Sequence, residues 1–130
     1  MKILQPPGWP RPKGYSNGIV ARGTHIILSG IVGWNEKEEF ETDDFAGQVS
    51  QVLRNIILLL EQADAKPEHL VRLTWYITNC DEYLNALKEI GTNYREIIGR
   101  HYPTMAVVEV SALIEDGAKV EIEATAIIPD

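Results

Sequence analysis

The chain has 130 residues, enough for one domain that buries most of its surface in a single core. Its 12 Lys and Arg are outnumbered by 19 Asp and Glu, and the formal charge of −7 without a basic cluster argues against a nucleic-acid partner. A single cysteine excludes an internal disulfide, and no apolar run approaches the roughly 18 residues that span a membrane, so we expect a cytoplasmic protein with no membrane partner.

The predicted elements begin after a short leader. Residues 1–14 are rich in Pro and Gly and are expected to hold no regular element, so a single domain is expected over 15–130. Two apolar, β-branched runs follow at 19–22 and 25–33, separated only by Gly23-Thr24. Such a short connection predicts an antiparallel hairpin.

Two helices and three further strands complete the predicted order. Apolar residues recur at every third and fourth position over 45–63, which predicts a helix of about five turns. A β-branched and aromatic strand is expected over 71–78, and a capping box then opens a second helix over 79–98. The closing strands are expected over 105–113 and 119–128.

This β-β-α-β-α-β-β order predicts an α+β fold in which both helices cover one face of a mainly antiparallel sheet. Alternation along the strands places on the helix face Trp75, Ile77, Val108, Val110, Val120 and Ile122. The other face then mixes apolar, hydroxyl and carboxylate groups: Ile27, Ser29, Ile31, Arg72, Thr74, Tyr76, Met105, Val107, Glu109, Glu121 and Glu123. Contact with another copy of the chain explains such a face better than exposure to water, so we expect a homo-oligomer with polar clefts between subunits.

Four short motifs follow one another along the chain: YSN at 15–17, LSG at 28–30, HYPTM at 101–105 and VEIEATA at 120–126. In this order and spacing they resemble the Rid family of reactive intermediate deaminases, also called YjgF-like or L-PSP endoribonuclease-like proteins. The resemblance covers about 15–128. It implies a chorismate-mutase-like fold, a homotrimer with small-molecule sites at the subunit interfaces, and hydrolysis of enamine and imine intermediates without a bound cofactor.

The resemblance also assigns site residues one at a time. Tyr15, Ser29 and Glu121 match the family's tyrosine, serine and glutamate. Glu121 and Ser29 are therefore the expected catalytic residues, with Glu121 handling the proton. Tyr15 is expected at the substrate, and the backbone of Gly30 or Val107 is expected near the developing charge.

Three family positions have lost their polar groups. The arginine that pairs with the substrate carboxylate in the family's active deaminases is Met105 here, an asparagine of the second helix is Gly91, and a glutamine is Ile31. A thioether cannot hold a carboxylate as a bidentate guanidinium does, so a standard 2-iminoacid is not the expected substrate. Arg100 in the HYP loop, or Arg72 on the sheet, is a candidate replacement for the lost anchor.

Other interpretations stay open beside these roles. Glu121 and Glu123 can pair with Arg72, Lys119 or a basic residue of a neighbouring subunit. Met105 can fill an apolar contact, and Gly91 can mark close packing. The three histidines lack metal-ligand spacing, so no metal is expected. Hydrolysis of an enamine or imine is thus the first hypothesis, and a non-catalytic trimer that binds a small metabolite is the alternative. A ribonuclease is less favoured because the chain is acidic.

Overall fold

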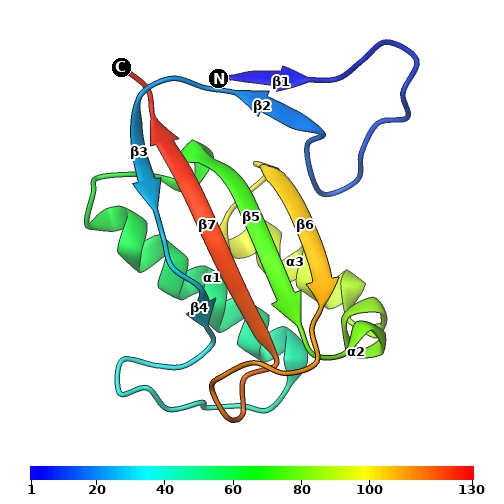
Figure 1. Ribbon diagram of the computed structural model, residues 1–130, viewed down its shortest axis with the longest axis vertical. Coiled ribbons are helices and arrows are strands. Elements are labelled where there is room, and N and C mark those ends of the chain that lie inside the picture. Colours follow the sequence, from blue (N-terminus) through cyan, green and yellow to red (C-terminus); the bar gives the residue numbers. More distant parts are fainter.

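The computed structural model describes every residue from 1 to 130 and consists of a main sheet with helices over one of its faces (Figure 1). The main sheet contains, in spatial order, β3 (Thr24–Ile27), β7 (Val120–Ile128), β5 (Leu70–Ile77) and β6 (Thr104–Glu109), with β4 (Ile31–Val32) also paired to β7. A separate two-stranded sheet joins β1 (Lys2–Leu4) to β2 (Gly18–Val20). Among the strands only β5 and β6 pair in parallel, which confirms an α+β fold with a mainly antiparallel sheet.

The first strands pair differently from the expected hairpin. The segment expected to hold no regular element starts with β1, which pairs with β2, whereas β3 pairs with β7. Gly23 lies where the chain leaves the small sheet for the large one, with φ of +142°. A β-carbon there would stand 2.7 Å from the Ile128 carbonyl carbon, so only glycine lets the chain pass this close to β7. Gly23 therefore marks a crossing between two sheets and not a hairpin turn.

Three α-helices cover one face of the main sheet, and a short 3₁₀ turn precedes β5. Their bounds are α1 (Phe45–Glu61), α2 (Cys80–Asn85) and α3 (Leu87–Ile97), and the turn is η1 (Pro67–His69). Asp44 caps α1 by accepting a hydrogen bond from the Gly47 amide at 2.9 Å. The expected second helix starts as predicted, with Asn79 accepting from the Glu82 amide at 3.0 Å, but it breaks at Ala86 into α2 and α3. None of the helices is long and apolar enough to cross a membrane.

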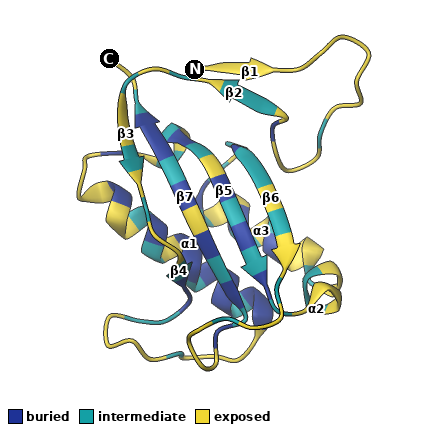
Figure 2. Cartoon of the chain, in the orientation of Figure 1, coloured by how far each residue is buried: buried dark blue, intermediate teal, exposed yellow.

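The core lies between α1, α3 and the helix-facing side of the sheet (Figure 2). Fully buried side chains come from α1, β5 and β7, and include Val49, Leu53, Ile56, Leu73, Ile77 and Val120. The expected helix-side positions Trp75, Ile77, Val120 and Ile122 are confirmed, because all four are buried in this cluster.

Strand β6 faces the opposite way from the prediction. Its parallel register pairs Met105 with Leu73 and Val107 with Trp75, so both β6 residues lie on the helix side. The placement of Met105, Val107 and Glu109 on the open face was wrong, and so was that of Val108 on the helix side, since its side chain is 44% exposed. A register shift of one residue reverses every side chain of a strand. Here the parallel pairing to β5 sets that register, and alternation alone could not reveal it.

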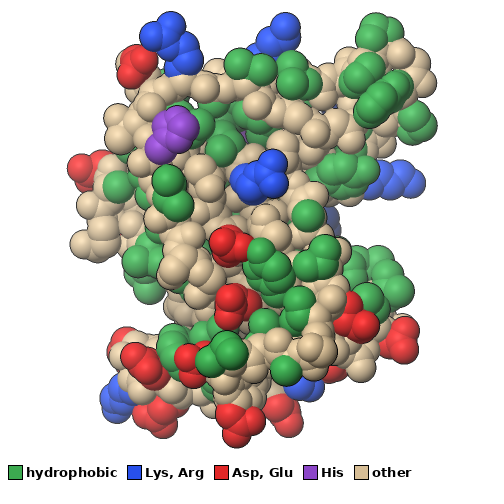
Figure 3. Space-filling view, in the orientation of Figure 1, with side chains coloured by type: hydrophobic (Ala, Val, Ile, Leu, Met, Phe, Trp, Pro, Cys, Tyr) green, Lys and Arg blue, Asp and Glu red, His purple; other side chains and the backbone are tan.

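The open face of the sheet carries the remaining residues of the predicted mixed surface. Figure 3 views this face, with acidic side chains over β7 at its centre and hydrophobic groups around them. Ile27, paired with Thr125 of β7, is 77% exposed there. Ile31 was also expected on this face, but it pairs with Ile122 and packs against the core instead.

Candidate functional site

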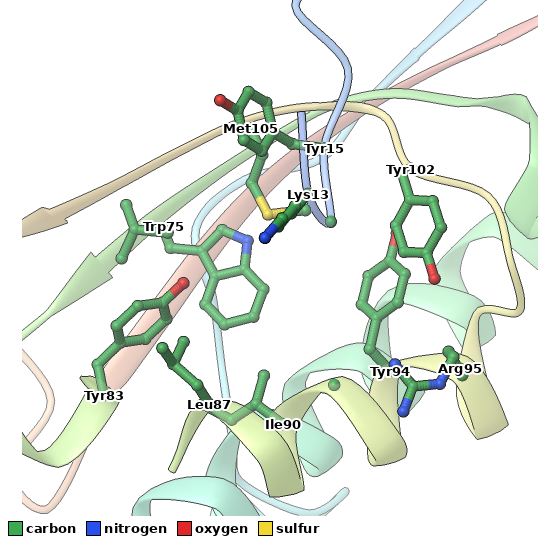
Figure 4. Close-up of a pocket in the computed structure, with 13 residues that line it drawn as sticks. Lys13, Tyr15, Trp75, Tyr83, Leu87, Ile90, Tyr94, Arg95, Tyr102 and Met105 are labelled. Carbon is green, nitrogen blue, oxygen red and sulfur yellow. The ribbon is translucent and has the colours of Figure 1, made fainter. Parts of the chain in front are cut away.

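A cavity of about 450 Å³ lies between α3 and the helix-facing side of β5 and β6 (Figure 4). Trp75 lines it from β5, Met105 and Val107 from β6, and Ile90 and Gly91 from α3. The break between α2 and α3 lets two short helices follow the edge of the sheet, so residues of both reach the cavity. Reversal of β6 relative to the prediction is what brings Met105 and Val107 into it.

Aromatic rings form much of the pocket wall. Trp75 meets Tyr83 edge to face, with ring centroids 6.2 Å apart, and Tyr94 stacks on Tyr102 at 5.7 Å. The Tyr94 hydroxyl donates to the His101 carbonyl at 2.6 Å. Burial raises the pKa of Tyr83 and of Tyr94 above the usual tyrosine value, so both rings stay neutral. The aromatic part of the wall is therefore uncharged.

Two cations line the same pocket, and neither was expected from the sequence. Lys13 comes from the segment before β2, and Arg95 lies one helical turn beyond Gly91 on α3. A β-carbon on Gly91 would stand 3.3 Å from Arg95 Nη1, so the guanidinium lies over the bare glycine backbone. The signal that could have found Arg95 is this i, i+4 spacing, which places two residues on one face of a helix. Lys13 gave no such signal.

The two arginines proposed from the sequence lie elsewhere. Arg72 follows the bulge of β5 and lines a groove beneath β2 on the open side of the sheet. Arg100 lines a separate groove with Trp9 and Arg11. Neither guanidinium lines the aromatic pocket.

A second group of predicted residues lies on the open face. Glu121 points from β7 toward Gly30, where a β-carbon would stand 2.7 Å from the Glu121 carboxyl carbon. Ser29, next to Gly30 in the chain, is exposed. Glycine thus lets the half-buried Glu121 carboxylate lie directly against the backbone, next to the exposed Ser29.

Glu123, two residues further on the same face, has a partner within the chain. Its carboxylate accepts a hydrogen bond from the Tyr76 hydroxyl on the neighbouring strand. That hydrogen bond is the main reason why the pKa of Tyr76 is raised, and the Glu123 and Glu121 charges add to it. Lys119, a possible partner of these glutamates by sequence, instead pairs with Glu82 at 3.0 Å. Glu123 therefore orders the sheet face, and Glu121 is the carboxylate beside Ser29.

One chain does not bring the whole predicted site together. Tyr15, Gly91, Met105 and Val107 line the aromatic pocket, with Tyr15 also reaching two neighbouring grooves. Ser29, Gly30 and Glu121 belong to the opposite side of the sheet. Nowhere do three His, Cys, Asp or Glu side chains gather as a metal ion would require.

The fold and this pocket define a class of α+β protein built on a mixed sheet with helices on one face. Residues 10–128 match the family model described as Endoribonuclease L-PSP. The chain therefore belongs to the Rid family, known also as the YjgF, L-PSP or RutC family.

Similar proteins occur in several bacteria. A RutC family protein of Aquifex aeolicus is 32% identical over 98% of this chain and 99% of its own length. The 2-iminobutanoate/2-iminopropanoate deaminase of Escherichia coli K12 is 32% identical over 81% of this chain and 80% of its own. Among solved structures, the Rid protein YyfB of Yersinia pestis has a TM-score of 0.83 at 30% identity, covering 98% of both chains. E. coli TdcF, solved with bound serine, has a TM-score of 0.71 at 26% identity, covering 98% of this chain and 99% of its own.

Proposed function

We propose that this protein hydrolyses a reactive enamine or imine in a homotrimer, and that each site joins the aromatic pocket of one subunit to Ser29, Gly30 and Glu121 of the next. The observation that carries this proposal is the division of the site between opposite faces of the sheet. In a closed ring of copies, the pocket surface of each subunit contacts the open sheet face of the next, so every pocket lies against a Glu121. The exposure of Ile27 beside the acidic cluster supports an open face that a second copy covers.

The chemistry needs few groups. Water adds to the carbon of the C=N bond, and Glu121 moves one proton from this water to the nitrogen, which gives a carbinolamine with a new C–O bond. Glu121 then moves the hydroxyl proton of the carbinolamine to its amino group, the C–N bond breaks, and ammonia leaves as the carbonyl product forms. Ser29 donates a hydrogen bond to the water or to the leaving nitrogen. No cofactor is required for this reaction.

The named activity of the E. coli relative supports an imine as substrate, and the serine in TdcF supports a small-molecule ligand in this fold. The substrate of this chain is proposed to differ from 2-iminobutanoate and 2-iminopropanoate. Met105 lies in the pocket at the position where the family resemblance places the carboxylate-binding arginine. Aromatic walls and a volume of about 450 Å³ also leave more room than a four-carbon substrate fills.

The test is direct. An amino-acid oxidase generates iminoacids in place from a panel of amino acids, and the decay of the imine is followed with and without the protein. We expect acceleration that is lost in Glu121→Gln, which keeps the shape of the side chain and removes its charge. Glu115→Gln, an exposed carboxylate in the loop before β7, is the matched control and is expected to remain active. Equal decay of the imine with and without the protein across the whole panel would exclude hydrolysis of amino-acid imines as the function.

A non-catalytic binding trimer is the second candidate, favoured by one observation. The aromatic pocket within a single chain contains no carboxylate and no histidine, the side chains that most often transfer protons near neutral pH. Thermal-shift screening against metabolites separates the two. A compound that raises Tm and is recovered unchanged supports binding, whereas one consumed only by the protein with Glu121 intact supports hydrolysis.

A further inference from the structure

The aromatic pocket is positively charged in an acidic protein. Lys13 and Arg95 both line it, and no Asp or Glu does. Neither cation has an ion-pair partner, because the salt bridges of the chain join Arg22 to Asp130 and Lys119 to Glu82. In a chain of formal charge −7, two unpaired cations in one cavity are a local reversal of charge that attracts an anion.

A buried donor faces the same cavity. The Trp75 side chain is 2% exposed, and its indole Nε1 is the one buried side-chain nitrogen or oxygen that has no hydrogen-bond partner. Figure 4 shows this nitrogen and the Lys13 ammonium directed toward the same part of the pocket, beside the Met105 sulfur. Buried donors are normally paired, so this one marks the place of an acceptor atom. Lys13 and Met105 have flexible side chains, so an acceptor atom of a ligand can reach the indole nitrogen once they turn aside.

The rest of the cavity suits an apolar body. Leu87 and Ile90 from α3 and the ring of Tyr83 line it below Trp75 and Lys13, and the Tyr94 ring lines it beside Arg95 (Figure 4). These groups offer dispersion and ring-edge contacts. Pockets of this size and apolar lining hold ligands that carry a ring or a branched chain.

We infer that the pocket binds a carboxylate with an aromatic or large branched side chain, and that the positive charges of Lys13 and Arg95, on different sides of the cavity, replace the charge of the arginine absent at Met105. On the proposed function, on which this inference rests, the substrate class is the imine of a bulky amino acid. Arg95 reaches the pocket because Gly91 has no side chain, so the two departures from the family pattern, at 91 and at 105, belong to one relocated anion site.

Binding of stable 2-oxo acids tests the inference without any hydrolysis. Phenylpyruvate, pyruvate and the uncharged phenylacetone are titrated into the full-length protein by calorimetry. We expect phenylpyruvate to bind at least tenfold more tightly than either of the others. Comparison with pyruvate isolates the contribution of the ring, and comparison with phenylacetone isolates that of the charge. Equal affinity for phenylpyruvate and phenylacetone would overturn the anion site. Equal affinity for phenylpyruvate and pyruvate would overturn the bulky side chain.

Substitutions then locate the charge. Arg95→Gln and Lys13→Gln are each expected to weaken phenylpyruvate binding about tenfold while leaving phenylacetone binding unchanged. Arg54→Gln and Lys88→Gln, exposed cations on α1 and α3 that do not line the pocket, are the matched controls and should bind as the parent does. Unchanged phenylpyruvate affinity in the Arg95→Gln/Lys13→Gln double variant would refute the assignment. Because no imine is present, failure of binding and failure of hydrolysis are separate results.

Discussion

Arg95 extends its guanidinium over Gly91, one turn earlier on α3, so that a β-carbon on Gly91 would stand 3.3 Å from Arg95 Nη1. Glycine inside a helix costs about 1 kcal/mol relative to alanine. Because Gly91 has no side chain, the pocket wall has space there for a charged group that a side chain at 91 would crowd. The helix is thus locally weakened at the point where it presents a cation to the cavity.

Gly91→Ala should therefore separate stability from binding. The change is expected to raise the free energy of unfolding by about 0.5–1 kcal/mol through helix propensity, because the flexible Arg95 side chain can move aside. The same movement should weaken phenylpyruvate binding. Urea denaturation and calorimetry measure the two effects. Thr92→Ala, at the exposed neighbouring position, is the control that leaves binding intact. Undiminished affinity in Gly91→Ala would contradict the coupling of Gly91 to Arg95.

Gly30→Ala tests the place of the Glu121 carboxylate. The new methyl group would occupy the position now taken by the carboxylate, so the flexible Glu121 side chain must turn away. We expect imine hydrolysis to fall about as far as in Glu121→Gln, while Tm changes by only a few degrees. Full activity in a folded Gly30→Ala protein would show that Glu121 need not rest against Gly30.

Gln48 connects α1 to the start of β7 and should be costly to remove. Its side chain is fully buried, its amide donates to the Thr42 and Gly117 carbonyls at 3.1 and 2.9 Å, and its oxygen accepts from the Lys119 amide at 2.8 Å. Gln48→Ala leaves these backbone groups unpaired and opens a cavity, so a loss of about 3 kcal/mol in unfolding free energy is expected. Gln51→Ala, which loses one bond to Asn55, should cost less than about 1 kcal/mol. Similar losses in both variants would contradict the role of Gln48.

Stability should fall at alkaline pH. Burial raises the pKa of Tyr83 and that of Tyr94, whereas in the unfolded chain each pKa is about 10. At a pH between the unfolded and the folded pKa, the unfolded chain has therefore lost protons that the folded chain keeps. Stability is then fully present below about pH 10 and declines above it, by up to about 1.4 kcal/mol per pH unit for each tyrosine. Tyr94→Phe should make the decline shallower, although loss of the hydrogen bond to His101 lowers stability at neutral pH. The unfolding free energy of Tyr94→Phe is measured by chemical denaturation between about pH 10 and 11.5. If it falls with pH as steeply as in the parent, Tyr94 is excluded as a source of the alkaline loss of stability.

The sequence predicted the elements whose signals are local. Periodicity placed α1, alternation placed β5 and β7, and the Asn79 cap fixed the start of α2. Pairing was less predictable because it depends on distant contacts. Gly23-Thr24 has the composition of a hairpin turn, and only the approach of Ile128 shows that the chain crosses between sheets there. The orientation of β6 follows from its register with β5, which no pattern within β6 reveals.

In the candidate site, too, the residues within local motifs were predictable and those brought in by the fold were not. The motifs identified Glu121, Ser29 and Gly30, which the fold brings together on β7 and the turn before β4. The cations of the pocket could not be found from motifs, because Arg95 and Lys13 lie in neither the YSN nor the HYPTM segment. Arg100 directly precedes the HYPTM segment and Arg72 lies on β5, but the loop and the sheet direct them to other grooves.

The central claim is that one site needs two chains, and mixed oligomers test it most directly. Glu121→Gln removes the proton carrier, and Leu87→Trp fills the pocket, so each protein alone should be inactive. After the two are mixed in equal amounts and refolded together, roughly a quarter of the interfaces should combine an intact pocket with an intact Glu121. We therefore predict recovery of roughly a quarter of the parent's imine hydrolysis. No activity above that of the separate variants, in mixed oligomers verified by mass spectrometry, would contradict a site shared between subunits.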